Sequence, residues 1–214
     1  MCWDSPTDRP TYLQRQPLPR SFFLRPTLEV ARDLLGAWLC RETAEGLTVG
    51  RIVETEAYGG PGDLASHARA GRTRRTTPMF GEVGHAYVYL VYGMHECLNV
   101  VAHGDGTEAG AVLLRAIEPL VGVDLMRTRR GRVTDPPFRL ASGPARLCQA
   151  MAVDRSFDAH DLTTGNGLWL AEPDQPPEAG DIVSGPRVGV EYAGEWATRP
   201  WRFWLTGNPS ASRR

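Results

Sequence analysis

Two carboxylates stand two positions apart within a strand-like segment of the chain. The segment RIVETEAY, residues 51–58, alternates apolar and polar positions as far as Glu54 and Glu56. Side chains two apart in a strand point to the same face of the sheet. With Tyr58 two positions further on, the pattern fits a general base beside an aromatic platform. A solvated strand edge would show the same pattern, so both interpretations stay open.

A second group of candidates lies in AYVYLVYGMHECLN, residues 86–99. Tyr87 and Tyr89 fall on one face of the expected strand, where they are either core residues or part of a binding surface. Tyr92 has the opposite parity and begins the turn sequence YGMH. Such a turn resembles an apolar wedge that enters a base stack.

An arginine interrupts the apolar segment AVLLRAIEP, residues 111–119. Burying the guanidinium of Arg115 is costly unless a carboxylate or a carbonyl meets it. If the strand is central, Glu56 or Glu118 is the expected partner. If the strand lies at an edge, Arg115 faces water.

The basic residues are unevenly distributed, and all 24 are arginine. Residues 69–75 hold four arginines and no acid, 115–155 hold eight arginines and four acids, and 156–195 hold one arginine and eight acids. Arginine forms paired bonds to phosphate oxygens, so a basic face suits DNA despite the net charge of −1. Ordinary solvated loops and a GC-rich genome remain alternative explanations. Without lysine, no lysine Schiff base with a sugar aldehyde can form.

Length and composition predict one folded domain. The chain has 214 residues, of which 42% are apolar. We expect a flexible arm over residues 1–21, the folded unit over 22–207 and a flexible tail over 208–214. Neither a membrane span nor a signal peptide is recognisable, so we expect no membrane partner and a cytoplasmic protein, nucleoid-associated if the source is bacterial.

The cysteines and histidines show no metal-ligand spacing. The four cysteines form no C-x-x-C pair, and we expect Cys40, Cys97 and Cys148 to be reduced core residues. We expect neither a metal nor a cofactor.

The elements that must position these residues alternate many strands with a few helices. Strands are expected over 37–43, 47–58, 85–92, 97–104, 111–119, 168–173, 187–194 and 202–207. Helices are expected over 27–35, 121–132 and 142–153, with Thr27 and Ser142 as N-caps of the first and last. The predicted class is α+β, a single domain with a curved, mostly antiparallel sheet and flanking helices. The long loop over 59–84 is expected to be functional.

Six segments, in this order and spacing, resemble the alkyladenine (3-methyladenine) DNA glycosylase family. They are RIVETEAY, SHARAGR, YVYLVYGMHECLNVV, VLLRAIEPL, SGPARLCQAM and VGVEYAGEW. The resemblance covers about residues 22–207. It implies a monofunctional enzyme of base excision repair, which flips an alkylated or deaminated purine out of duplex DNA and hydrolyses its N-glycosidic bond. The implied substrates are 3-methyladenine and hypoxanthine, with ethenoadenine and 7-methylguanine as further candidates.

The resemblance also implies roles for individual residues. Glu56 would be the general base that activates water for attack on the sugar C1′, with Arg115 and the main chain of Val188 holding that water. The flipped base would lie between Tyr58 on one side and His67 with Tyr89 on the other. At the pocket floor, Asn99 would disfavour guanine through its exocyclic amine. For neutral lesions, no side chain is an obvious general acid.

The remaining implied residues contact DNA. Tyr92 would fill the gap that the flipped nucleotide leaves, with Met94 and His95 near the minor groove, and Arg69 and Arg72 would contact phosphates loosely. The expected partner is double-stranded DNA that contains damaged purines, bound by a monomer. Two other functions stay open: a DNA-binding module without catalysis, and a hydrolase of free nucleosides.

Overall fold

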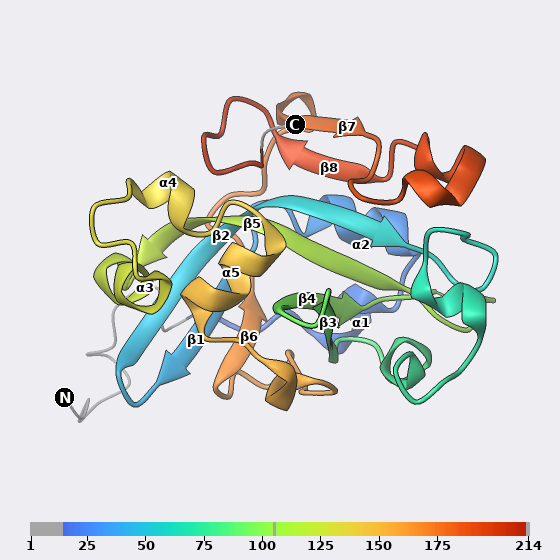
Figure 1. Ribbon diagram of the computed structural model, residues 1–214, viewed down its shortest axis with the longest axis horizontal. Coiled ribbons are helices and arrows are strands. Elements are labelled where there is room, and N and C mark those ends of the chain that lie inside the picture. Colours follow the sequence, from blue (N-terminus) through green and yellow to red (C-terminus); the bar gives the residue numbers. More distant parts are fainter. Residues whose placement is uncertain (1–14, 105, 213–214) are drawn as a thin grey trace.

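One antiparallel sheet organises the molecule. The computed structural model describes residues 15–104 and 106–212. Eight strands form the sheet, in the order β3-β4-β5-β2-β1-β6, while β8 pairs with β2 and β7 pairs with β8 (Figure 1). The strands are β1 (Trp38–Thr43), β2 (Gly46–Tyr58), β3 (Ala86–Val91), β4 (His95–Val101), β5 (Ala111–Val121), β6 (Leu168–Ala171), β7 (Ile182–Gly185) and β8 (Arg202–Leu205).

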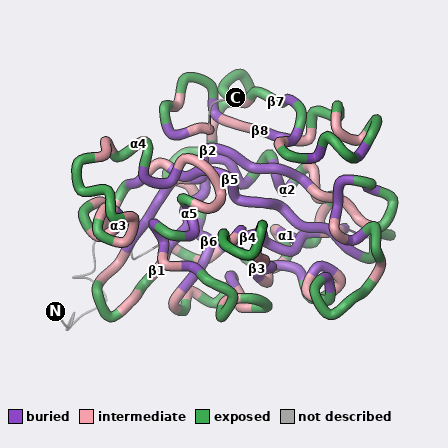
Figure 2. Tube along the Cα trace, in the orientation of Figure 1, coloured by how far each residue is buried: buried purple, intermediate pink, exposed green. Residues whose placement is uncertain are grey.

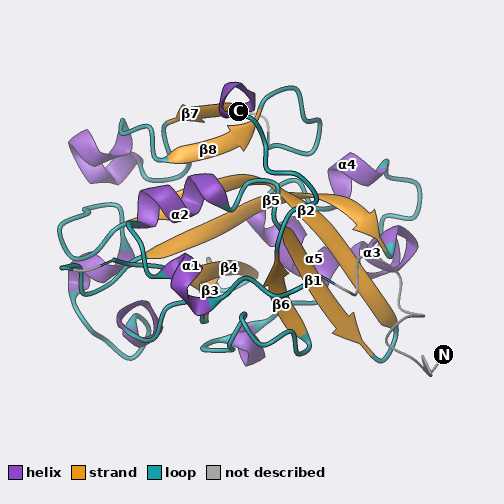
Figure 3. Ribbon diagram, turned by 180° about the vertical axis from the view of Figure 1, so that it is seen from behind, coloured by secondary structure: helices purple, strands orange, loops and turns teal. Residues whose placement is uncertain are grey.

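Helices cover both faces of this sheet. The α-helices are α1 (Arg20–Phe23), α2 (Thr27–Asp33), α3 (Val123–Arg130), α4 (Pro137–Leu140) and α5 (Pro144–Met151). The 3-10 helices are His67–Ala70, Thr77–Phe80, Arg155–Phe157, Ala179–Asp181 and Glu191–Ala197. Helix α5 lies in front of the sheet in Figure 1, and α2 lies in front of it in the reverse view of Figure 3. The predicted α+β class with an antiparallel sheet is confirmed.

Strand β2 is the element on which the two carboxylates lie, and it is covered along both edges. Its first half pairs with β1, and Glu54–Glu56 pair with β8, while β5 runs along the other edge. Glu54 and Glu56 are both fully buried. The interpretation of these carboxylates as a solvated strand edge is therefore wrong.

The hydrophobic core lies between the sheet and the helices. Buried residues follow β2 and β5 along most of their length and the first half of β1 (Figure 2). The largest apolar cluster includes Leu34 and Leu35, just after α2, with Ile52 of β2, Leu114 of β5 and Met151 of α5. As predicted, Cys40, Cys97 and Cys148 are buried and unpaired.

Several local predictions differ from the structure. The segment 187–194 forms no strand; it is a loop that leads into the 3-10 helix Glu191–Ala197. Its alternation of apolar residues resembled a strand, but Gly189 has a φ of +76°. Neither predicted N-cap is correct, because Thr27 is already helical and donates to the Ala102 carbonyl, and Gly143 takes the cap position of α5.

Residues at both ends of the described chain are packed, where a flexible arm and a flexible tail were expected. Leu18 is buried, and Pro17 forms an isolated bridge with Ala171 at the edge of the sheet. Ser210 is also buried. The folded unit therefore extends beyond 22–207, while residues 1–14 and 213–214 lie outside the described part. Among the described residues, no helix has the length and apolar character that crossing a membrane requires.

Gly122 provides a test of the packing at the start of α3. Its φ is +71°, and a Cβ would lie 2.4 Å from the Leu47 carbonyl oxygen, which the sheet holds in place. We expect Gly122→Ala to lower the free energy of unfolding by about 2–5 kcal/mol, since strain and overpacking add. Gly131, at the other end of α3, has a φ of +59° and no atom within 4 Å of such a Cβ. In chemical denaturation, Gly131→Ala should lose about 1–2 kcal/mol, and equal losses for the two variants would contradict this account.

Candidate active site

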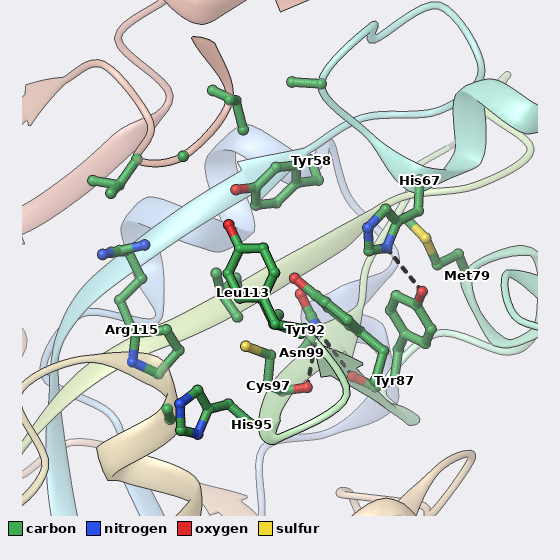
Figure 4. A pocket seen from close by; sticks show the side chains of 18 of the residues that line it. Tyr58, His67, Met79, Tyr87, Tyr92, His95, Cys97, Asn99, Leu113 and Arg115 are labelled. Carbon is green, nitrogen blue, oxygen red and sulfur yellow. Dashed lines mark hydrogen bonds between the residues drawn. The ribbon is translucent and has the colours of Figure 1, made fainter. Parts of the chain in front are cut away.

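A cavity of about 440 Å³ opens beside the end of β2, a volume within the ~300–1,000 Å³ typical of ligand sites. Its walls come from β2, β5, the β3–β4 hairpin, the start of α5, the 3-10 helix at His67 and the loop at Val188. The side chains of Tyr58, His67 and Arg115 all border this cavity (Figure 4). Segments far apart in the sequence thus meet at one pocket.

Glu56 lies directly behind the wall of the pocket. Its Oε1 accepts a hydrogen bond from the Val188 N–H at 2.7 Å, and its Oε2 accepts one from the Tyr58 hydroxyl at 2.8 Å. The Arg115 Nη1 lies 3.2 Å from the same Oε2. All three donor residues line the cavity. The carboxylate is therefore fixed by groups that a ligand in the pocket would touch.

Arg115 connects Glu56 to the other carboxylate of β2. Its Nε donates to the Glu54 Oε1 at 2.7 Å. Burial alone would lower the pKa of the Arg115 guanidinium, but the charges of Glu56 and Glu54 outweigh it and raise that pKa. Of the two partners predicted for Arg115, Glu56 is confirmed, whereas Glu118 is bonded to Arg51 instead.

A β-bulge places Arg115 between the two carboxylates. Glu54 pairs with Ala116 and the next residue of β2, Thr55, pairs with Leu114, so Arg115 is the extra residue of β5. Bulges of this kind redirect a side chain and are common beside active sites. No pattern in the sequence marks this bulge.

Glu54 is the centre of a hydrogen-bond network that sequence reasoning missed. Besides Arg115, its Oε1 accepts from the Arg202 Nε at 2.7 Å and from the Ser212 hydroxyl at 2.8 Å. Its Oε2 accepts from the Ser212 N–H at 2.6 Å. The network ties β5, β8 and the C-terminal segment to one buried carboxylate. The only signal for it in the sequence was that a buried arginine needs a partner.

Aromatic rings form the far wall of the pocket. Tyr87 and Tyr89 stack with their centroids 5.3 Å apart, which confirms that they share a strand face. The His67 ring stands edge-on to Tyr89 at 4.6 Å, and its Nδ1 is hydrogen-bonded to the Tyr87 hydroxyl at 2.9 Å. Burial lowers the pKa of His67 to about 4, with the charges of Arg75 and Arg69 adding to the effect. Since this wall is uncharged at neutral pH, it can stack against a planar ligand.

The Tyr58 ring, on β2, packs against Arg187, which the sequence patterns did not identify as part of the site. The Arg187 guanidinium lies 4.9 Å from the Tyr58 ring and 4.9 Å from the Trp201 ring. It forms a buried, bidentate pair with Asp63 at 2.6 and 2.9 Å and donates to the Ala57 carbonyl. Because Val188 is the next residue, this arginine also fixes the loop that reaches Glu56.

Asn99 and Cys97 lie at the base of the cavity on β4. The Asn99 Nδ2 donates to the main-chain carbonyls of Tyr87 and Cys97. These two acceptors determine which way the amide faces, because only its nitrogen can donate to them. Burial raises the pKa of the Cys97 thiol to about 11, so the thiol is neutral and acts as a small apolar contact.

The hairpin between β3 and β4 projects from the rim of the pocket. Tyr92 is 88% exposed and Met94 is 72% exposed. Tyr92 and His95 line the pocket, whereas Met94 borders a smaller neighbouring hollow. Tyr92 also has a positive φ of 53°, an uncommon conformation for a residue other than glycine. Residues held in such sparsely populated backbone conformations cluster at functional sites.

Arg69 and Arg72 lie outside the pocket, on exposed parts of the long loop. Arg69 donates to the Leu64 carbonyl and lies against the Tyr192 ring, and Tyr192 lines the pocket. Arg72 donates to the Phe80 carbonyl and lies over the Phe80 ring. Both side chains are thus oriented by local contacts.

The protein is a DNA glycosylase, a hydrolase of N-glycosyl bonds, since a family model described as methylpurine-DNA glycosylase matches residues 21–209. Over 197 residues, the chain is 49% identical to a protein of Methanocella arvoryzae named among the 3-methyladenine DNA glycosylases, covering 92% of this chain and 96% of that protein. It is 44% identical over 200 residues to the DNA-3-methyladenine glycosylase of Homo sapiens, covering 89% of this chain and 66% of the human protein. The chain belongs to the methylpurine-DNA glycosylase family, which confirms the resemblance seen in the sequence.

The Glu54 network predicts a large difference between two glutamates. Glu54→Gln removes the charge from a buried carboxylate that faces two arginines, so we expect a loss of about 3–5 kcal/mol in the free energy of unfolding. Glu118→Gln is the matched control. Glu118 forms an ion pair with Arg51 in which the Arg51 side chain is 42% exposed and the Glu118 side chain 33% exposed, so this pair should contribute less than about 1 kcal/mol. Chemical denaturation measures both, and similar losses would refute the role of Glu54.

The lowered pKa of His67 predicts how stability depends on pH. We expect an NMR titration of His67 with a midpoint near the value of about 4, whereas an unfolded histidine titrates near ~6.5. Because the unfolded state binds the proton first, His67 destabilises the fold as the pH falls from about 6.5 to about 4. The His67→Gln variant should lose this part of the pH dependence. A midpoint near 6.5 in the folded protein would contradict the prediction.

Proposed function

We propose that the protein flips a damaged purine nucleotide out of duplex DNA and hydrolyses its N-glycosidic bond with a water that Glu56 activates. One observation carries this proposal: Glu56 is bonded to Tyr58, Val188 and Arg115, and all three residues line the pocket. A carboxylate in this position can act on a nucleotide held in the cavity.

The chemistry requires one carboxylate for two tasks. As the C1′–N9 bond of the nucleotide breaks, positive charge develops on the sugar, and the negative charge of Glu56 stabilises it. Water then forms the new bond to C1′ and gives its proton to Glu56, while the purine leaves with the electrons of the broken bond. Arg115 and the main chain of Val188 orient the water. Alkylation at N3 or N7 gives the leaving purine a positive charge already, so these lesions need no general acid.

The pocket walls support binding of a planar base. Tyr58, His67 and Tyr89 all line the cavity, and stacking of a base between such rings contributes about 1–3 kcal/mol per base. The His67 N–H stands at the first position of its 3-10 helix, where a main-chain donor has no partner within the helix. This main-chain N–H can bind a lesion that has a hydrogen-bond acceptor at the position where adenine has its amine. It would thus favour such lesions over adenine. Asn99 at the base of the pocket excludes the additional amine of guanine.

The exposed hairpin supports the flipping step. Tyr92 would enter the base stack where the nucleotide has left, with Met94 and His95 toward the minor groove. Arg69 and Arg72 would contact the phosphate backbone beside the pocket. Because one chain supplies every residue of the site, we propose that it acts as a monomer.

Base release from a panel of single-lesion duplexes tests the proposed function. We expect free base from duplexes that contain hypoxanthine or 3-methyladenine, with an intact strand that carries an abasic site and no borohydride-trapped adduct. Ethenoadenine and 7-methylguanine duplexes complete the panel, and undamaged duplex is the control. Lesion binding without release would indicate a binding module, and hydrolysis of free inosine in preference to duplex hypoxanthine would indicate a nucleoside hydrolase.

A further inference from the structure

A second cavity, of about 750 Å³, lies on the other side of the start of α5. Four arginines line it: Arg130 at the end of α3, Arg132 just after it, Arg139 of α4 and Arg146 of α5. We call these four residues and the cavity between them the arginine cleft. Residues of the C-terminal segment, including Ser212, form its remaining wall.

The positive charge of the arginine cleft is only partly compensated, because one carboxylate, Asp135, lines it beside the four arginines. Within residues 15–104 and 106–212, none of its four arginines lies within ion-pair distance of a carboxylate. The Arg130 Nη1 is bonded to Gln149, whereas its Nε is buried without a hydrogen-bond partner there. Burial lowers the pKa of Arg130, and the charges of Arg146 and Arg132 lower it further, although the charge of Asp135 opposes them in part. An anion in the cleft would relieve this repulsion.

The arginine cleft adjoins the catalytic pocket at three places. On α5, Ala145 lines the pocket and the next residue, Arg146, lines the cleft. Ser142, which lines the cleft, forms a bridge with Ala116, the neighbour of Arg115. The Ser212 hydroxyl on the cleft wall lies 3.4 Å from the Arg115 Nη2. The cleft and the pocket are therefore neighbours, so a duplex whose damaged nucleotide enters the pocket would pass close to the cleft.

A second basic segment lies on the other side of the pocket. The arginines within residues 69–75 are all exposed, and this loop lies toward the opposite end of the long axis from α3 and α4 (Figure 1). A duplex with its damaged nucleotide in the pocket would extend toward both groups of arginines. Separate contacts on the two sides of a lesion would fix the register of the duplex on the protein.

We propose that the arginine cleft binds backbone phosphates of the duplex on one side of the damaged nucleotide. This inference rests on the proposed function, because the pocket is what places the duplex. Guanidinium groups bind phosphate oxygens through paired hydrogen bonds and read no base sequence. The cleft contributes to affinity and to register, and it takes no part in breaking the glycosidic bond.

Duplex binding at several salt concentrations tests the proposal with Arg146→Ala and with the double variant Arg139→Ala/Arg146→Ala. Both side chains are exposed, so the fold is retained, and thermal melting checks this. Arg32→Ala is the matched control, because it removes one exposed arginine from α2 on the opposite face. The probes are a duplex with one hypoxanthine and the same duplex undamaged.

We expect both cleft variants to bind both duplexes more weakly, while Arg32→Ala binds like the wild type. The slope of log affinity against log salt should become shallower by about one for each arginine–phosphate pair that the substitution removes. With enzyme in excess at saturating concentration, the single-turnover rate of base release should stay unchanged. Affinity and slope equal to those of Arg32→Ala, or a slower rate at unchanged affinity, overturn the proposal. If the wild type releases no base, the proposed function fails, whereas binding of undamaged duplex still tests the cleft.

Discussion

Arg115 holds two buried carboxylates at once, and the architecture around the pocket depends on this interaction. Its Nε contacts Glu54 at 2.7 Å and its Nη1 contacts Glu56 at 3.2 Å, inside the sheet. Buried charges are tolerated only when their partners and hydrogen bonds are complete. For Glu54, the partners come from β8 and the C-terminal segment, through Arg202 and Ser212. The C-terminal segment therefore packs against the sheet as far as Ser212.

The two carboxylates of β2 differ in their surroundings, and this difference fits a structural role for Glu54 and the proposed chemical role for Glu56. Besides Arg115, Glu54 accepts from Arg202 and Ser212, which do not line the pocket, whereas the described donors to Glu56 all border it. Arg187 helps to hold the donors to Glu56 in place. Its guanidinium lies against the Tyr58 ring and forms a buried ion pair with Asp63. A nucleotide in the pocket would thus meet groups that are already oriented, which is the condition for electrostatic catalysis.

Local patterns in the sequence predicted the elements better than the contacts between them. Alternation over 51–58 identified β2 and placed Glu54 and Glu56 on one face, because strand periodicity is a local property. Of the two carboxylates that Arg115 contacts, Glu56 was among the predicted partners and Glu54 was not. A bulge and the pairing register of β2 and β5 decide these contacts. The segment 187–194 was read as a strand, although it is a loop. The contacts of Arg187 and Ser212 join residues more than 100 positions apart, and no local pattern encodes them.

The most direct test of this account is the single-turnover rate of base release by Glu56→Gln. The rate is measured on a hypoxanthine duplex with enzyme in excess, beside equilibrium binding of the same duplex. We expect a rate at least about 100-fold below the wild type, with binding retained, because the amide keeps the shape of Glu56 but neither its charge nor its basicity. Release at the rate of the wild type would contradict the central role of Glu56.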